Sequence, residues 1–276
     1  MNEHAQTLIA LDMDGTLLNS DHVVSERNRQ ALFRAARAGH YVALATGRTL
    51  SEILHTLEIL PCVTHIVGEN GAAIWSVRPM ERLYRVNLSK ERARRVLDTV
   101  LPYDPLIQMF IGDQSYLDCA PNDDLTPFHI EEFRPVFEEG SIFRPGLIEY
   151  GMREGAPLGK INAYFRTPQQ RDLAWAAATN ASLEPAKSIG LGAEFSPDGI
   201  SKGRGLMALC EILRLPLSQT IAFGDGGNDL DLLSTAGIGV AMGNASDEVK
   251  AHADQITEDC DHDGVANALN RLIPEL

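Results

Sequence analysis

The chain has 276 residues, which is enough for one large domain or two ordinary ones. Hydrophobic residues make up 44% and charged residues 22%, the usual proportions for a globular protein. The net charge of −14 at pH 7 argues against nucleic acid or an anionic membrane surface as a general partner, and no apolar run reaches the roughly 18 residues of a membrane span.

The first residues and the cysteines bear on the cellular compartment. Met1–Gln6 is polar and the first apolar run ends at Asp12, so no targeting signal is visible. The four cysteines are far apart and form no C-x-x-C pair, which predicts buried free thiols and fits a reducing cytoplasm. These cysteines are Cys62, Cys119, Cys210 and Cys260.

Two carboxylates close the first predicted strand. The apolar run from Leu8 to Leu11 is short enough for one buried strand and leads directly into Asp12 and Asp14. Residues two apart on a strand point to the same side, and two like charges there are costly unless a cation or a shared proton compensates them. Carboxylate oxygens suit Mg²⁺, so the stretch indicates a magnesium site. A solvated turn is the alternative, because Asp and Gly are common turn residues.

The first third of the chain alternates strands and helices. Ser25 is a suitable N-cap for a helix through about Ala38, and residues 41–45 form a second apolar strand. A helix over residues 51–60 and a strand over residues 65–67 follow. This alternation predicts a parallel sheet, in which ligands gather at the carboxyl ends of the strands.

A turn, Gly68-Glu69-Asn70-Gly71, follows the third strand and leads to a short strand over residues 72–77. A simple hairpin turn is one interpretation of this stretch. The other arises from the family resemblance described below, in which this turn lies near the active-site edge of the core.

The middle of the chain has a different pattern, which begins after about Arg82. We expect a helix over residues 89–101, strands over 106–111, 115–118 and 160–166, and a helix that starts after Thr167 and ends near Asn180. Residues 121–157 give only a weak signal. Helices interleaved with hairpins indicate an α+β unit.

The alternating pattern returns near Gly192. Residues 193–195 are strand-like, and Ser201 caps a helix that carries Lys202 in its first turn. The strand over residues 220–223 ends in the motif Gly224-Asp225-Gly226-Gly227-Asn228-Asp229. A helix, a strand over residues 238–242 and two further helices complete the chain.

Four motifs therefore follow strands or open a helix in a fixed order: Asp12-x-Asp14, Thr46-Gly47-Arg48, Lys202 and Asp225 to Asp229. Together they resemble the haloacid dehalogenase superfamily of phosphohydrolases, and within it the Cof-type phosphatases. The resemblance implies an α/β fold with a Rossmann-like doubly wound parallel-sheet core, residues 1–83 and 191–276. It also implies an inserted α+β cap domain, residues 84–190, hinged near residues 82–87 and 188–192.

The resemblance implies roles for the aspartates. Asp12 is the nucleophile that forms an aspartyl-phosphate, and Asp14 protonates the leaving alcohol and then activates water. The metal ligands are the Asp12 side chain, the Asp14 backbone carbonyl and Asp225, while Asp229 orients Asp225 or a metal-bound water. The dehalogenase branch lacks the second aspartate, so halide displacement is not expected.

Other residues are expected to bind the phosphate. The Thr46 hydroxyl and the Gly47 amide can donate to phosphate oxygens, although these two residues taken alone are also typical of a simple turn. Lys202 can neutralise nucleophile and phosphate together. A solvated lysine is the alternative for Lys202, although the helix dipole disfavours a cation there. Asn228 either binds the phosphate, holds Asp225, or acts only as a helix N-cap. Arg48 reaches either substrate or a surface carboxylate.

These expectations amount to a Mg²⁺-dependent phosphomonoesterase acting on a small phosphorylated metabolite, such as a sugar phosphate or a phosphorylated cofactor, as a monomer or homodimer. A phosphomutase and a non-catalytic phosphometabolite sensor are the alternatives. The cap is expected to select the leaving group. Four charged residues of the cap are expected to be solvated and structural: Asp113, Arg144, Lys160 and Arg166.

Overall fold

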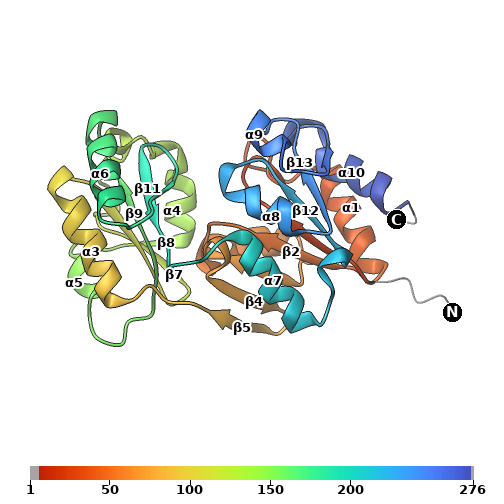
Figure 1. Ribbon diagram of the computed structural model, residues 1–276, viewed down its shortest axis with the longest axis horizontal. Coiled ribbons are helices and arrows are strands. Elements are labelled where there is room, and N and C mark those ends of the chain that lie inside the picture. The colour runs from red at the N-terminus through yellow and green to blue at the C-terminus, as the bar shows by residue number, and fades with distance from the viewer. Residues whose placement is uncertain (1–5, 275–276) are drawn as a thin grey trace. The chain divides into compact units, whose positions relative to one another are not determined.

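The computed structural model describes residues 6–274 of the chain (Figure 1). Residues 1–5 and 275–276, which belong to the predicted core, lie outside the described residues. The chain divides into two compact units. The first contains the N-terminal part through Gly47, residues Thr56–Arg85 and the part from Ile200 onward; the second contains Arg48–His55 and Val86–Gly199.

The first unit is built on an eight-stranded sheet. The six strands from β14 to β3 are parallel, whereas β4 and β5 each run antiparallel to the strand before them. In spatial order the strands are β14 (Gln255–Ile256), β13 (Ile238–Ala241), β12 (Thr220–Gly224), β1 (Leu8–Leu11), β2 (Tyr41–Ala45), β3 (His65–Gly68), β4 (Ala73–Val77) and β5 (Met80–Arg85).

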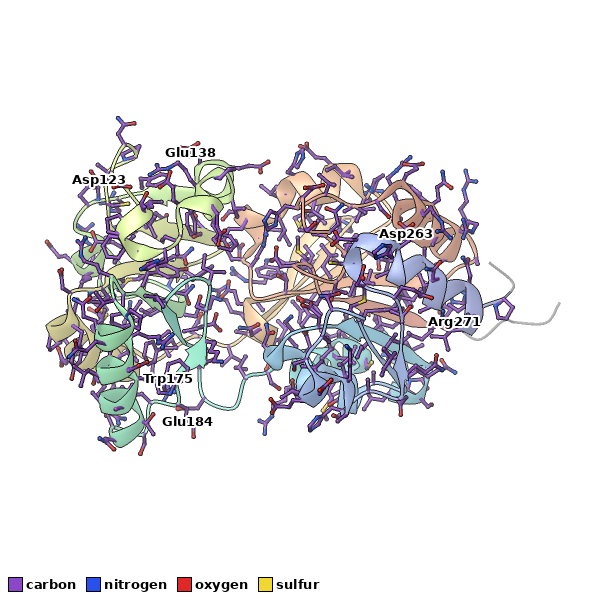
Figure 2. The ribbon with its side chains drawn as sticks, turned by 90° about the horizontal axis from the view of Figure 1, so that it is seen from above. Asp123, Glu138, Trp175, Glu184, Asp263 and Arg271 are labelled. Carbon is purple, nitrogen blue, oxygen red and sulfur yellow. The ribbon has the colours of Figure 1, made fainter. Side chains whose placement is uncertain are left out.

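Helices cover both faces of this sheet. Leu8 and Ala10 point into an apolar cluster that also contains Leu206 of α7 and Leu232 of α8. Ile9, their neighbour on the opposite face, is equally buried. On that side α1 packs against α10, whose ends are marked by Asp263 and Arg271 in Figure 2. The helices are α1 (Glu26–Arg37), α7 (Lys202–Leu213), α8 (Leu230–Thr235), α9 (Asp247–Lys250) and α10 (Gly264–Leu272).

Local signals explain where these elements begin and end. The Ser25 hydroxyl accepts the amide of Asn28 and caps α1, and strand β2 has the predicted bounds. The predicted helix over residues 51–60 is instead a 3₁₀ turn, Leu50–Glu52, followed by α2 (Leu54–Ile59). Strand β5 was not predicted because most of its side chains are exposed and show no apolar alternation.

The second unit is built on a six-stranded sheet. Neighbouring strands are antiparallel except β7 and β8, which are parallel. In spatial order the strands are β10 (Ala186–Lys187), β11 (Gly192–Phe195), β9 (Leu158–Tyr164), β6 (Leu106–Ile111), β7 (Gln114–Leu117) and β8 (Ser141–Phe143). The helices are α3 (Lys90–Val100), α4 (Arg134–Gly140), α5 (Leu147–Gly151) and α6 (Pro168–Asn180).

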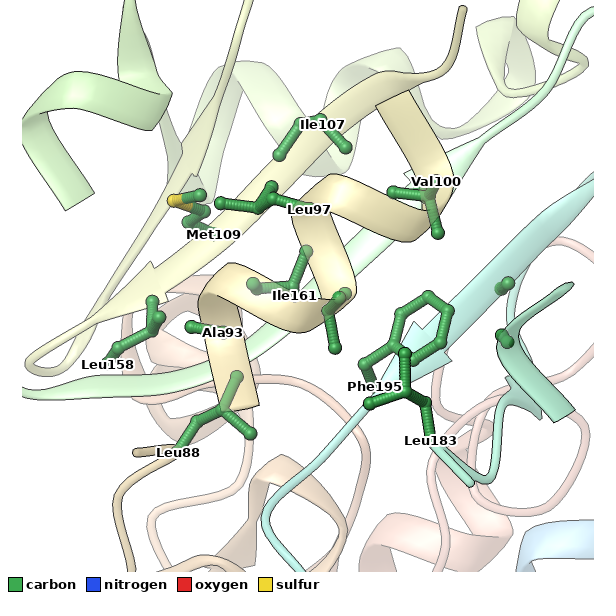
Figure 3. Close-up of a cluster of buried hydrophobic side chains, with 14 of the residues drawn as sticks. Leu88, Ala93, Leu97, Val100, Ile107, Met109, Leu158, Ile161, Leu183 and Phe195 are labelled. Atoms are coloured by element: carbon green, nitrogen blue, oxygen red, sulfur yellow. The ribbon is translucent and has the colours of Figure 1, made fainter. Parts of the chain in front are cut away.

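Alternate residues of strand β6 face two different layers of this unit. Ile107 and Met109 pack with Leu97 of α3 in the cluster of Figure 3, and α6 contributes to the same cluster. Leu106, on the other face, packs with Phe137 of α4. Trp175 on α6 and Glu138 on α4 mark the two layers in Figure 2. The unit is therefore a sheet with helices on both sides.

The strand at residues 192–195 is a correction to the sequence-based prediction. We expected it in the core, but β11 pairs antiparallel with β9 and belongs to the six-stranded sheet. Its apolar pattern predicts a buried strand without naming the partner strand, which is a long-range property. The segment with the weak signal, residues 121–157, contains α4, β8 and α5.

The structure also bears on the cysteines and on membrane-spanning helices. All four cysteines are free and buried, as predicted. Among residues 6–274, no helix has the length and apolar character that crossing a membrane requires.

Candidate active site

The predicted motifs of the first unit meet where three neighbouring parallel strands end. Asp12 follows β1, Thr46 follows β2 and Asp225 follows β12, and β1 lies between the other two strands. The Asp12 amide continues the ladder by donating to the carbonyl of Phe223 at 3.0 Å. The carboxyl ends of parallel strands therefore bring together residues that are more than 200 positions apart.

Lys202 is buried between two carboxylates. Its Nζ lies 2.5 Å from Oδ1 of Asp12 and 2.7 Å from Oδ1 of Asp229, and only 1% of the residue is exposed. The helix cap places it there, because the Ser201 hydroxyl accepts the amide of Arg204 and starts α7 at Lys202. The solvated-lysine alternative is therefore wrong.

Asp229 uses both of its oxygens within the protein. Oδ1 accepts from Lys202, while Oδ2 accepts the backbone amides of Asp225 at 3.1 Å and Gly226 at 2.9 Å. The residue is fully buried. Its carboxylate thus fixes both the lysine and the loop that carries Asp225.

Asp225 is held by two residues that sequence reasoning did not select. The Thr16 hydroxyl donates to its Oδ1 at 2.8 Å, and the Asn244 amide donates to its Oδ2 at 3.2 Å and to the carbonyl of Gly15 at 2.9 Å. Thr16 belongs to the D-x-D-G-T stretch, and Asn244 lies shortly after the end of β13, beside β12. Position at a strand end was the signal that could have indicated Asn244.

Gly15 is required by this arrangement. Its φ of +78° lies in the left-handed region, and a Cβ on it would collide with the Asp225 carboxylate. Asp14, the preceding residue, is exposed, and its Oδ1 lies 3.9 Å from Nδ1 of His22. The Asp14 carboxylate is therefore accessible to solvent beside the buried Asp12.

The electrostatics of the cluster favour a bound cation. Burial, and then the charge of Asp229, raise the pKa of Asp12 well above its usual value against the opposing effect of Lys202. Burial raises the pKa of Asp225 to about 6. Burial opposes the charge of Lys202, but the two carboxylates beside it outweigh burial and raise its pKa. A second positive charge would restore the ionised carboxylates.

The donor set fits a hard divalent cation. Asp12, Asp225 and Asp229 each offer one oxygen, and these oxygens lie within 4.8 Å of one another. Asp229 is fully buried and its oxygens already accept an ammonium and two backbone amides, whereas Asp225 is only partly buried and accepts from neutral side chains. Asp12 and Asp225 are therefore the two carboxylates suited to direct coordination. Oxygen-only donors are the ligands that Mg²⁺ prefers.

Thr46, Gly47 and Asn228 lie around a fourth residue, Asn70. The backbone N–H of Asn70 donates to the carbonyl of Thr46 at 3.0 Å, and the side-chain amide of Asn228 donates to Oδ1 of Asn70 at 3.3 Å. A Cβ on Gly47 would lie 3.2 Å from the same Oδ1. Asn228 sits inside the 3₁₀ turn Gly227–Asp229 that precedes α8, so it is not the helix N-cap.

Comparison with known proteins identifies the family. Residues 9–269 match the family model of the haloacid dehalogenase-like hydrolases. The chain belongs to this family. It is 31% identical to phosphatase YwpJ of Bacillus subtilis over 96% of this chain and 99% of that protein. A haloacid dehalogenase-like hydrolase from Bacteroides thetaiotaomicron superposes with a TM-score of 0.84 at 28% identity, covering 97% of this chain and 100% of that one.

A third relative is a 5-amino-6-(5-phospho-D-ribitylamino)uracil phosphatase, YcsE of Bacillus subtilis, which is 30% identical over 96% of this chain and 95% of that protein. These matches confirm the resemblance to Cof-type phosphatases and the α/β fold. The haloacid dehalogenase-like chain is therefore a phosphatase that acts on phosphorylated small molecules.

The second unit of this phosphatase changes one expectation. Lys160 was expected to be solvated, but it is buried, with its Nζ 2.6 Å from Oε2 of Glu194 and 4.6 Å from the ring centre of Phe110. Arg166 is exposed, as expected, and its Nε lies 3.2 Å from Oδ2 of Asp104. The burial of Lys160 was not predicted, because the sequence pattern of its strand does not indicate that Glu194, 34 residues away, is its partner.

Arg48 opens the segment Arg48–His55 that groups with the second unit. Its predicted contact with substrate stays a prediction.

Proposed function

We propose that this phosphatase hydrolyses phosphate monoesters of small metabolites through an aspartyl-phosphate on Asp12, with Mg²⁺ as its cofactor. One observation supports the proposal above all others. A buried carboxylate at the end of β1 is fixed through one oxygen by Lys202, within reach of a second carboxylate, Asp225. Because Lys202 binds Oδ1 of Asp12, the other carboxylate oxygen of Asp12 is the one that we assign as the nucleophile.

The two half-reactions use Asp12 and Asp14 in turn. Oδ2 of Asp12 attacks phosphorus, so a bond from this oxygen to phosphorus forms while the bond to the leaving oxygen breaks and Asp14 gives that oxygen its proton. Asp14 then takes a proton from water, whose oxygen attacks the same phosphorus. The bond between phosphorus and Asp12 breaks, and phosphate leaves.

Asp12, the backbone carbonyl of Asp14 and Asp225 are the residues that would hold the magnesium ion. When bound, it supplies positive charge that offsets the repulsion between carboxylate and phosphate. Asp229, Thr16 and Asn244 act on this site indirectly, because they hold Asp225 and its loop in place.

We assign four residues to binding of the phosphate oxygens: Thr46, Gly47, Lys202 and Asn228. Arg48 is a further substrate contact in this proposal. Lys202 is the best supported of these, since its ammonium already touches the nucleophile. Its charge would neutralise the phosphate and Asp12 together.

The second unit is the cap in this proposal, and it selects the leaving group. The sequence predicts a cap over residues 84–190, and the second compact unit comprises Arg48–His55 and Val86–Gly199. Sugar phosphates and phosphorylated cofactors are the substrate classes that we propose, and the relative named as a 5-amino-6-(5-phospho-D-ribitylamino)uracil phosphatase makes a phosphorylated ribityl compound one candidate.

A substrate panel tests the function. We expect phosphate release from one or a few sugar phosphates, nucleotides or phosphorylated cofactors with Mg²⁺, and none with a chelator. Asp12→Asn is the matched control, because it keeps an oxygen acceptor for Lys202 but should lower kcat by at least about 10⁴-fold. Unchanged hydrolysis in this variant would exclude Asp12 as nucleophile.

Two other results would redirect the proposal. Phosphoryl transfer between hydroxyls without release of phosphate would favour a phosphomutase on the same site. Silence across the panel with folded, Mg²⁺-loaded protein would favour a sensor that binds phosphorylated metabolites.

A further inference from the structure

The turn that carries Asn70 has an unusual backbone. Glu69, Asn70 and Gly71 all have positive φ, at 51°, 54° and 98°. This region is ordinary for glycine, tolerated by asparagine and unfavourable for glutamate. Three such residues in a row persist only when surrounding contacts hold them, and conformations of this kind cluster at functional sites.

Contacts on three sides hold this turn in place. The Glu69 carboxylate is fully buried and receives both terminal nitrogens of Arg85, at 3.1 and 3.2 Å. The backbone N–H of Asn70 donates to the carbonyl of Thr46, the residue that follows β2. A Cβ on Gly71 would collide with the carbonyl of Ser201, the residue before Lys202. The turn therefore fits tightly between β2 and the start of α7.

These contacts place the Asn70 side chain between Gly47 and Asn228. Its Oδ1 accepts an N–H from the Asn228 amide, while the Asn228 oxygen lies on the other side, against Gly226. The Asn228 amide group carries two hydrogens, and Asn70 binds one of them. The orientation of this amide is therefore set by an acceptor oxygen on Asn70.

We propose that Asn70 is a positioning residue of the phosphate site: its side-chain oxygen holds the Asn228 amide so that a second N–H, and not the oxygen, faces the substrate phosphate. A reversed amide would present an acceptor to an anion and repel it. The inference rests on the proposed function, since it assumes that Asn228 binds phosphate.

Asn70→Gly is the variant that isolates this role. Glycine adopts the left-handed conformation without strain, so only the side chain is lost. Arg214→Gly is the matched control, because Arg214 is an exposed residue at the end of α7 with nearly the same backbone, φ 54° and ψ 40° against 54° and 33° for Asn70. Melting temperatures of both variants report any structural change.

Orthophosphate binding and turnover are measured together. Calorimetric titration of the Mg²⁺-loaded protein with orthophosphate should give a dissociation constant about 5- to 30-fold weaker in Asn70→Gly. KM should rise by a similar factor with a smaller change in kcat. Asn228→Ala combined with Asn70→Gly should bind no more weakly than Asn228→Ala alone, because the two residues act through one contact. Arg214→Gly should match the wild type.

The outcomes separate this inference from the proposed function. If the wild type releases phosphate but Asn70→Gly binds orthophosphate normally, or its effect adds to that of Asn228→Ala, the role of Asn70 is overturned and the function stands. If no substrate is hydrolysed but orthophosphate binding weakens as described, Asn70 keeps its role and the function fails. A wild type that neither hydrolyses any substrate nor binds orthophosphate overturns both, and a wild type that hydrolyses substrate without detectable orthophosphate binding overturns the role of Asn70 if KM is unchanged in Asn70→Gly.

Discussion

At the scale of single residues, Lys202 determines how the site is charged. Two carboxylates that would repel each other, those of Asp12 and Asp229, both accept hydrogen bonds from its ammonium group. A buried ion pair contributes little net stability compared with apolar residues, but removal of one partner leaves the other charge buried and uncompensated. The lysine thus keeps the two carboxylates together, and in our proposal it also binds the substrate phosphate.

Lys202→Met tests both needs. We expect loss of phosphatase activity and a fall of about 3–5 kcal/mol in the free energy of unfolding, because two buried carboxylates lose their counter-ion. Urea titration at pH 7 measures the second effect. Lys187→Met, at an exposed position of β10, is the control and should change stability by less than about 1 kcal/mol. Equal stability of Lys202→Met and wild type would contradict the argument.

At the scale of elements, a buried ion pair between Glu69 and Arg85 is one of the contacts that support the turn after β3. Glu69 is fully buried, and Arg85 at the end of β5 is nearly so. The turn in turn contacts the end of β2 and the start of α7, which carry Thr46 and Lys202. One ion pair therefore supports two segments of the proposed phosphate site.

Arg85→Met should remove the ion pair with Glu69 and destabilise the protein. The variant leaves the Glu69 carboxylate buried without its main partner, so we expect a loss of about 3–5 kcal/mol in the free energy of unfolding. The double variant Glu69→Gln with Arg85→Met should lose less, because no charge is then buried. Arg82→Met on the exposed side of β5 is the control. An Arg85→Met protein as stable as the control would show that the pair is dispensable.

Much of the element order was predictable, since local chemistry specifies it. Ser25 and Thr167 cap their helices as expected, and β2 has the predicted bounds. What sequence reasoning missed depends on distant partners: β11 pairs with β9, and Lys160 is buried by Glu194. These partners lie dozens of residues away, and no local pattern names them.

The same distinction holds for the candidate site. Asp12, Asp225 and Asp229 were selected from motifs that follow strands and Lys202 from the start of a helix, and the structure brings these four residues together. The residues that hold them were not selected, because their contacts span the chain. Asn244 donates to a carbonyl 229 positions away, and the contact of Asn70 with Asn228 spans 158.

At the scale of the whole molecule, the net charge affects substrate binding, and the division into two units affects how a bound metal stabilises the protein. The chain carries a net charge of −14, so an anionic substrate is repelled except where Lys202 and a bound cation reverse the field. Each of the two units has its own sheet and its own apolar clusters. Two units of this kind can unfold in separate transitions, and a metal held by Asp12 and Asp225 stabilises only the unit that contains them.

The metal-dependent stability of this unit should change with pH. In the metal-free protein the pKa of Asp225 is raised from 3.8 to about 6, so the folded state binds its proton more tightly than the unfolded state does. The free energy of unfolding contributed by this group therefore falls as pH rises from about 4 to about 6. Mg²⁺ competes with that proton, so it should stabilise the protein more above pH 6 than below it.

Scanning calorimetry with and without Mg²⁺ at pH 5.0 and pH 7.5 measures this difference. At a fixed Mg²⁺ concentration of about 100 times its dissociation constant at pH 7.5, the transition of the first unit should gain about 2.7 kcal/mol at pH 7.5 and clearly less at pH 5.0, where the proton on Asp225 weakens binding. Asp225→Asn should remove most of the gain at both values, because one carboxylate ligand is lost. A gain of equal size at both pH values would show that Asp225 is not a ligand whose proton the metal displaces.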